Sequence, residues 1–288
     1  MLTLQVLANG LALGGLYASI AAGFSLVWGV LNVINLLHGS LIVLGGYLAY
    51  FAFAAFGVSP FVFAPVAGLA LFALGYAVQV VAVNPVMGRP VLMTLTLTFG
   101  LNLLLDNIML SAFSADYRKI TLDPPLGIVE LGQALVPVDR LIATAVGLAL
   151  VAGLWLLLRT TQLGRAIVAV RMDREAAALM GIDVRRIYAL AFALGAFMAG
   201  AAGALFAAIF PISPVASGGY LGKAFVICVL GGLGSVPGVV VGGFALGVIE
   251  SFGALAFGPE HAGTLAFVLL IALLVVRPQG LLGRAGFQ

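Results

Sequence analysis

The N-terminal third of this chain carries no charged side chain. No Asp, Glu, Lys or Arg occurs in residues 1–88, and the first charge is Arg89. A helix that crosses a bilayer needs about 20 consecutive apolar residues, so this stretch is long enough for three or four crossings. A water-soluble domain cannot be built from it, because such a domain needs charged groups on its surface. The stretch therefore belongs in lipid.

The rest of the chain extends this pattern. The sequence is 63% hydrophobic and 8% charged, with a mean hydropathy of +1.23, whereas about 25% of the residues in a soluble domain are charged. We expect one all-α polytopic membrane domain over residues 1–288, with eight or nine spans. The number stays open because the seventh apolar run is short and interrupted by glycine. The predicted spans are residues 5–30, 38–57, 61–83, 91–112, 140–158, 187–210, 220–234, 236–256 and 262–276.

The basic residues predict how the chain is oriented. Six of the 13 lie in residues 159–186, and two more lie in the tail, residues 277–288. The positive-inside rule places both segments in the cytoplasm and the acidic loop 113–139 outside. Counting spans backward from that loop places the N-terminus outside as well. A basic cluster this local is an orientation signal and does not indicate a nucleic-acid partner.

Two glycine-containing segments interrupt the helical pattern at membrane depth, residues 29–40 and residues 230–238. Unwound backbone cannot face lipid, because each unpaired amide costs several kcal/mol. The breaks lie in the first and last thirds of the chain. That arrangement is typical of transporters built from pseudo-symmetric halves around a site near mid-membrane. We therefore assign Asn35 and Gly234, which lie in these breaks, to a translocation pathway.

Three ionisable residues, His38, Lys223 and Glu250, lie in or beside apolar segments. A charge there costs about 2.5–3.5 kcal/mol unless it is paired or hydrated. A Lys223–Glu250 ion pair would relieve both charges, and lining of the pathway explains them equally well, so both roles stay open. For His38 we favour a structural hydrogen bond to the broken backbone beside it over pathway lining. Asn102 and Asp106 share one helix face and are expected to join helices.

The basic segment 159–186 contains a short predicted helix. Asp173 is a good N-cap, Gly181 is a good residue to follow the last turn, and alanine dominates between them. A helix of about two turns is unstable alone, so it must pack on something. Its small apolar side chains suit insertion into a groove of another protein, and the alternative is a helix lying on anionic lipid. The residues assigned to docking are Arg171, Asp173, Glu175, Ala176, Ala177 and Gly181.

The same segment resembles a known signature. Glu175-Ala176-Ala177 followed by Gly181 is similar to the first half of the EAA motif of ABC importer permeases. Other segments resemble the branched-chain amino-acid permeases of the H-subunit type, with urea permeases as close relatives. The chain departs from that family at Ser40, where many relatives have Glu, and it lacks the second half of the EAA motif. The resembling segments, within about Asn9 to Gly283, are Asn35-Leu-Leu-His38-Gly39, Gly164-Arg-Ala, Lys223-Ala-Phe, Val229-Leu-Gly-Gly-Leu-Gly-Ser-Val-Pro-Gly238 and Arg277-Pro-Gln-Gly-Leu-Leu-Gly283.

The resemblance implies a division of labour. The chain would supply the pathway for branched-chain or related amino acids in the bacterial inner membrane, together with a second homologous permease. Two ATP-binding cassette subunits would dock on residues 159–186 and bind the ATP, so that this chain needs no cofactor. An external substrate-binding protein would deliver the substrate. A urea or short-amide permease stays open as an alternative, as does an ion-coupled secondary transporter that uses buried Glu250.

Motifs for catalysis are absent from the sequence. Residues 217–224 approach a phosphate-binding loop, but Ser217 replaces its first glycine and Ala224 follows the lysine where Ser or Thr is required. His38 and His261 have no neighbouring ligands at metal spacing. We therefore expect neither an enzyme nor a metal site, and no ATP-hydrolysing site in this chain.

Overall fold

The computed structural model describes residues 2–122, 125–131, 134–258, 261–276 and 280. Each of the nine predicted apolar runs corresponds to one long helix, because a helix pairs all of its backbone amides internally. These helices are α1 (Leu2–Leu31), α2 (His38–Phe56), α3 (Pro60–Val78), α4 (Val91–Phe113), α5 (Val138–Thr160), α8 (Val184–Ile209), α9 (Ser217–Gly231), α10 (Val236–Phe257) and α11 (Ala262–Val276).

Shorter elements connect the long helices. A π-helical turn η1 (Gln79–Val83) and a 3-10 turn η2 (Asn84–Val86) extend α3, and η3 (Pro214–Ala216) leads into α9. Helices α6 (Gln162–Met172) and α7 (Arg174–Leu179) form the basic segment. The loop between α4 and α5 contains a feature that the sequence did not predict, an antiparallel hairpin of β1 (Ile128–Leu131) and β2 (Ala134–Pro137).

Eight helices in the described part of the chain are long and apolar enough to cross a membrane. The seventh of them, which the sequence marked as doubtful, reaches that length because η3 extends α9 to Pro214–Gly231. The shorter apolar helix is the ninth run, α11, which has 15 residues. The uncertainty in the number of spans therefore belongs to α11 and not to α9. The predicted cytoplasmic tail, residues 277–288, lies outside the described residues except for Gly280.

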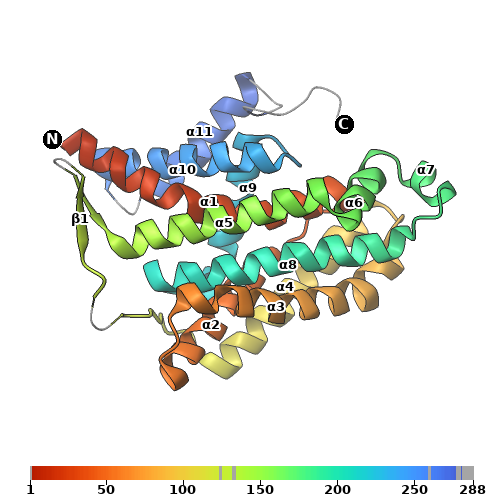
Figure 1. Cartoon of the computed structure of the whole chain (residues 1–288), viewed down its shortest axis with the longest axis horizontal. Coiled ribbons are helices and arrows are strands. Elements are labelled where there is room, and N and C mark those ends of the chain that lie inside the picture. Colours follow the sequence, from red (N-terminus) through yellow and green to blue (C-terminus); the bar gives the residue numbers. More distant parts are fainter. Residues whose placement is uncertain (1, 123–124, 132–133, 259–260, 277–279, 281–288) are drawn as a thin grey trace.

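The long helices form a bundle with distinct ends (Figure 1). The N-terminus and the β1–β2 hairpin lie at one end, where the Gln5 side chain and the Leu135 backbone exchange two hydrogen bonds of 2.6 and 2.7 Å. Helix α7 lies at the opposite end. The segments predicted as external and cytoplasmic therefore lie at opposite ends of the bundle, with the N-terminus beside the former.

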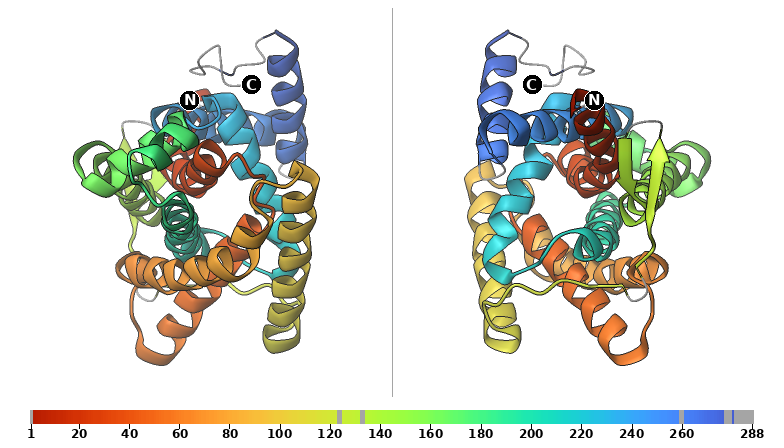
Figure 2. Two further views of the ribbon diagram at one scale, coloured as in Figure 1. Left: turned by 90° about the vertical axis from the view of Figure 1, so that its right-hand side faces the viewer. Right: turned by 90° about the vertical axis from the view of Figure 1, so that its left-hand side faces the viewer.

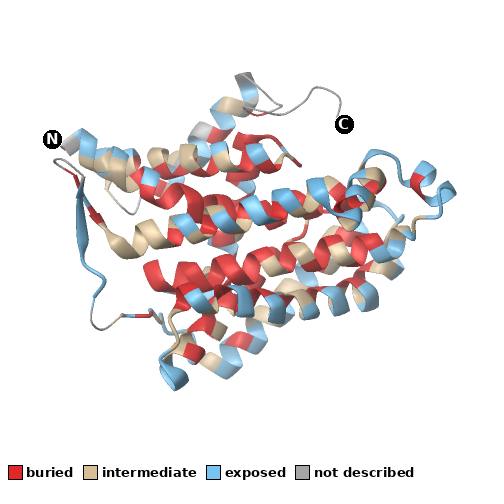
Figure 3. Ribbon diagram, viewed as in Figure 1, coloured by how far each residue is buried: buried red, intermediate tan, exposed pale blue. Residues whose placement is uncertain are grey.

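Helices α1 and α8 form the buried centre of the bundle (Figure 3). Glycines let their backbones approach the neighbouring helices closely, as is common inside membranes. A methyl group added at Gly10 of α1 would lie 2.8 Å from the carbonyl oxygen of Gly247 in α10. One added at Gly45 of α2 would overlap the carbonyl oxygen of Gly200 in α8. Side chains larger than hydrogen at these crossings would push the helices apart.

Two helices are much less enclosed. Viewed along the bundle, α4 and α11 lie along one edge, outside α9 (Figure 2). Of the 18-residue apolar stretch with which α4 could cross a membrane, only 11% is buried within this chain. The outer face of α4 is therefore left to lipid or to another protein.

The two predicted breaks are present and lie next to each other. Helix α1 ends at Leu31 and is followed by Asn32, a left-handed residue with φ of 55°. Gly232 and Gly234 adopt φ of 99° and 74° between α9 and α10. A methyl group added at Gly29, in the last turn of α1, would lie 3.0 Å from the Cα of Gly234. The meeting point of the breaks also contacts Arg171 of α6, so it lies nearer the α6 end of the bundle than the sequence suggested.

Candidate functional site

A partly buried triad of Tyr17, Lys223 and Glu250 joins α1, α9 and α10. The Nζ of Lys223 lies 2.9 Å from both carboxylate oxygens of Glu250, and the Tyr17 hydroxyl donates to Glu250 Oε2 at 2.5 Å. Lys223 also donates to the Tyr17 oxygen at 3.1 Å and lies 4.8 Å from the centre of its ring. The ion pair that the sequence suggested is therefore formed. Tyr17 was missed because it is 206 residues from Lys223 and carries no local signal.

His38 is fully buried at the start of α2. Its Nε2 lies 2.9 Å from the carbonyl oxygen of Ile20 in α1, and its ring packs edge-on against Phe24. The favoured structural role agrees with this geometry, but the partner is the carbonyl of an intact helix and not the broken backbone. Asn35 is also buried, and its backbone oxygen accepts from the His38 amide at 3.3 Å. His38 therefore holds the end of the first break against α1.

Asp106 links α4 to two other helices. Its Oδ1 accepts from the hydroxyl of Ser40 at 2.7 Å, and its Oδ2 accepts from the hydroxyl of Ser217 at 2.7 Å. Ser40 lies in the first turn of α2 and Ser217 begins α9, so the first turns of two helices, whose dipoles favour an anion, meet at this carboxylate. Asn102 donates to the same carboxylate at 3.1 Å. The prediction that Asn102 and Asp106 join helices is confirmed.

Helix α7 begins and ends at the predicted residues. Oδ1 of Asp173 accepts from the backbone amides of Glu175 and Ala176 at 2.9 and 3.0 Å, which caps its N-terminus. Gly181 has φ of 84°, and the amide of Ile182 donates to the oxygen of Ala177 at 3.1 Å. This is the Schellman pattern of a helix C-terminus. Helix α7 is too short to be stable alone, and residues of its own segment cap both of its ends.

The side chain of Ala177 does not lie where the docking prediction needs it. Ala177 is buried within this chain and belongs to the core cluster, so it cannot enter a partner's groove. The most exposed large apolar residues of this segment are Met172, Leu179 and Met180. None of these three was predicted to dock, although an apolar Leu-Met pair outside every predicted span was a signal. Ala176 and Glu175 are exposed as expected.

Arg171 lies between the docking segment and the two breaks. A methyl group added at Gly234 would be 2.8 Å from its Nη2, and one added at Gly29 would be 3.6 Å from its Cζ. Burial lowers the pKa of Arg171 from its ordinary value, although a guanidinium remains charged in proteins. A cavity of about 410 Å³ adjoins it, lined on one side by the end of α1 and on the other by α6 and α7.

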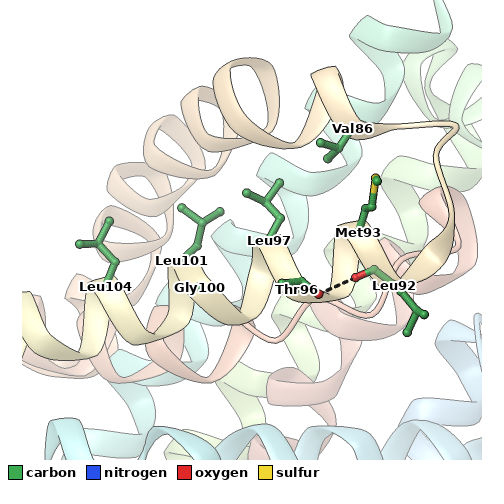
Figure 4. A pocket seen from close by; sticks show the side chains of 8 residues that line it. All are labelled: Val86, Leu92, Met93, Thr96, Leu97, Gly100, Leu101 and Leu104. Carbon is green, nitrogen blue, oxygen red and sulfur yellow. Dashed lines mark hydrogen bonds between the residues drawn. The ribbon is translucent and has the colours of Figure 1, made fainter.

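An apolar hollow of about 600 Å³ lies between Val86 of η2 and residues 92–104 of α4 (Figure 4). Its only polar side chain, Thr96, donates to the oxygen of Leu92 in its own helix at 2.8 Å. No lining residue carries a group that would recognise a zwitterion, so this hollow suits acyl chains or apolar side chains. Among the described residues no cluster of three His, Cys, Asp or Glu side chains could hold a metal.

The eight apolar helices, the paired helix breaks and the capped helix at one end of the bundle define a multi-pass membrane permease. Residues 6–274 match the family described as "Branched-chain amino acid transport system / permease component". The chain belongs to this family.

Named relatives and one solved structure agree with that assignment. The chain is 35% identical to the high-affinity branched-chain amino acid transport system permease protein BraD of Pseudomonas aeruginosa, over 98% of this chain and 96% of that protein. It is 32% identical to the permease protein LivH of the corresponding system in Escherichia coli, with the same coverage. PsaBC from Streptococcus pneumoniae in complex with Fab shares the fold, with a TM-score of 0.54, 13% identity, and 95% and 92% of the two chains covered. BraD and LivH are both named as permease proteins of transport systems.

Proposed function

We propose that this chain is the permease subunit of an ATP-driven importer of branched-chain or related amino acids in the bacterial inner membrane. Its membership of the permease family over residues 6–274 and its similarity to BraD and LivH support the substrate class. ATP would be bound by separate ATPase subunits, so that the chain itself needs no cofactor. A second homologous permease and an external substrate-binding protein complete the proposed assembly.

The observation that carries this proposal is the exposed apolar surface of α7. Leu179 and Met180 are 89% and 83% exposed, in a segment that lies outside every candidate span. Apolar side chains at a helix end, held in place by an N-cap and a Schellman turn, suit a groove in a soluble partner. The end of the bundle that carries α7 is also the basic end, which the positive-inside rule assigns to the cytoplasm, where ATP is available.

Two other surfaces are available to the second permease and to the external binding protein. The outer face of α4, a helix whose apolar stretch is only 11% buried within this chain, is available to a second permease as well as to lipid. The hairpin end of the bundle, opposite α7, is the end at which an external binding protein would deliver substrate (Figure 1). The Lys223–Glu250 pair and the two breaks lie inside the bundle, where a pathway between these ends would run.

The test separates docking from folding. Leu179→Asp and Met180→Asp place a charge in the proposed apolar contact, whereas Tyr117→Asp changes a 69% exposed residue in the loop at the opposite end and serves as the control. We expect normal amounts of inserted protein for all three variants and loss of co-purifying ATPase only for the first two, which should also lose uptake of radiolabelled leucine. ATPase retention and wild-type uptake in both would contradict the proposal.

Two further arms address the alternatives. Uptake that persists after ATP depletion and collapses with the proton gradient would favour an ion-coupled transporter. Competition by excess urea, with none by isoleucine or valine, would assign the chain to urea or a short amide.

A further inference from the structure

Arg171 connects the docking segment to both breaks in the bundle. It lies in the last turn of α6, two residues before Asp173, the N-cap of α7. Its guanidinium lies against the backbone of Gly29 at the end of α1 and of Gly234 between α9 and α10. Three regions that are far apart in the sequence therefore meet at one side chain.

The chemistry of the contact suits an arginine. The last carbonyl groups of a helix have no partner within it, and the dipole makes that end negative, so a cation is favoured at the end of α1. The planar guanidinium presents five donors in a fixed geometry, which a lysine cannot reproduce. Glycine is required on the other side, because a methyl group at Gly234 would lie 2.8 Å from Nη2 and the residue has φ of 74°.

We propose that Arg171 is a positioning residue that transmits displacement of α6 and α7 to both breaks and so controls the adjoining end of the translocation pathway. This inference rests on the proposed function, since it requires an ATPase that moves α7. Non-helical segments absorb changes in backbone angles more readily than continuous helices do. The cavity of about 410 Å³ beside Arg171 leaves space for the end of α1 and the α6–α7 junction to move against each other.

The first experiment uses the full transporter, with both permeases, the ATPases and the binding protein, reconstituted in liposomes. Arg171→Gln is compared with Arg165→Gln, which removes an exposed arginine from the same helix, α6. We expect both complexes to retain the ATPases and to hydrolyse ATP within about twofold of the wild-type rate. Leucine transported per ATP should fall at least tenfold for Arg171→Gln alone. An unchanged ratio in an intact complex, or loss of the ATPases, would overturn the proposal.

A glycine substitution tests the same contact from the other side. Gly29→Ala keeps the arginine but places a methyl group 3.0 Å from the Cα of Gly234 and 3.6 Å from Arg171 Cζ. It should also lower the leucine-to-ATP ratio. Gly153→Ala is the matched control, because a methyl group there meets nothing within 4 Å. Equal ratios for the two alanine variants would count against the proposal, and this pair remains informative if Arg171→Gln fails to fold.

A spectroscopic readout separates positioning from mere stabilisation. Environment-sensitive labels are placed singly at Val168 on α6 and at Leu233 in the second break, both partly exposed, in a Cys228→Ala background. Vanadate trapping should change both signals in the otherwise wild-type complex. With Arg171→Gln the Val168 signal should still change and the Leu233 signal should not. A Leu233 response that survives refutes the positioning role, whereas a Val168 label that never responds, in a complex without bound ATPase, refutes the proposed function.

Discussion

The Lys223–Glu250 pair yields a quantitative prediction. Lys223→Met leaves the Glu250 carboxylate, whose side chain is 11% exposed, with only the Tyr17 hydroxyl as a donor. Removing one partner of a buried ion pair costs about 3–5 kcal/mol, and partial exposure places this case near about 3 kcal/mol. Glu250→Gln keeps an acceptor for Tyr17 and leaves an ammonium that is 27% exposed, so we expect a smaller loss of about 1–2 kcal/mol.

The double variant distinguishes a structural pair from two pathway groups. With both charges removed no desolvation penalty remains, so Lys223→Met with Glu250→Gln should lie within about 1 kcal/mol of wild type. The coupling energy of the cycle, which is the sum of the two single losses minus the loss of the double variant, would then be about 3–5 kcal/mol. At about 2 °C per kcal/mol for a chain of this size, Lys223→Met should lower Tm by about 6 °C, and the double variant should recover most of that loss.

The chain contains its own reporter for this assay. Cys228 is its single cysteine and is fully buried, with Sγ 3.3 Å from the oxygen of Ala21. Reaction with a fluorescent maleimide during a thermal ramp in mild detergent therefore follows unfolding. A double variant no more stable than the worse single variant would refute a structural pair. A double variant that folds but no longer transports leucine would assign the two charges to the pathway.

Three further outcomes are expected. Gly203→Ala should lower thermal stability by several degrees, because a methyl group there would overlap the backbone of α2, whereas Gly153→Ala should not; equal Tm values would contradict this packing. Gly181→Val forces a β-branched residue to φ of 84° at a cost of about 1–2 kcal/mol. The inserted protein should remain while the co-purifying ATPase is lost, and a retained ATPase would contradict docking on α7. Cysteines replacing Tyr117 and Met172, in a permease expressed alone without its native cysteine, should react with an impermeant reagent from opposite sides; labelling from one side would reverse the topology.

The local sequence was sufficient to predict those features that depend only on the lipid environment or on the residues at one helix end. Residues 1–88 fold into helices because uncharged backbone in lipid must satisfy its own hydrogen bonds. Asp173 and Gly181 mark the ends of α7 because a side-chain acceptor and a left-handed residue act within four residues of where they stand. These features depend on chemistry that is readable in a short window.

The wrong predictions concerned the direction in which a single side chain points and the partner that it meets. Ala176, Ala177 and Ala178 are identical in sequence, yet only Ala177 is buried, because that direction of α7 meets the bundle. The partner of His38 was placed in the adjacent break, whereas the chain brings the oxygen of Ile20 within 2.9 Å. Neither outcome depends on local preference. Each follows from where a distant helix packs.

By itself the sequence determined that this protein lies in a membrane, where its helices and breaks fall, and which short helix is capped at both ends. Only the tertiary structure decided which polar groups meet: Tyr17 with Lys223 and Glu250, Asp106 with the first turns of two helices, and Arg171 with both breaks. The physical reason is that lipid and helix caps act on a residue through its immediate chain neighbours. These contacts join segments up to 233 residues apart, and close packing at glycine crossings selects them.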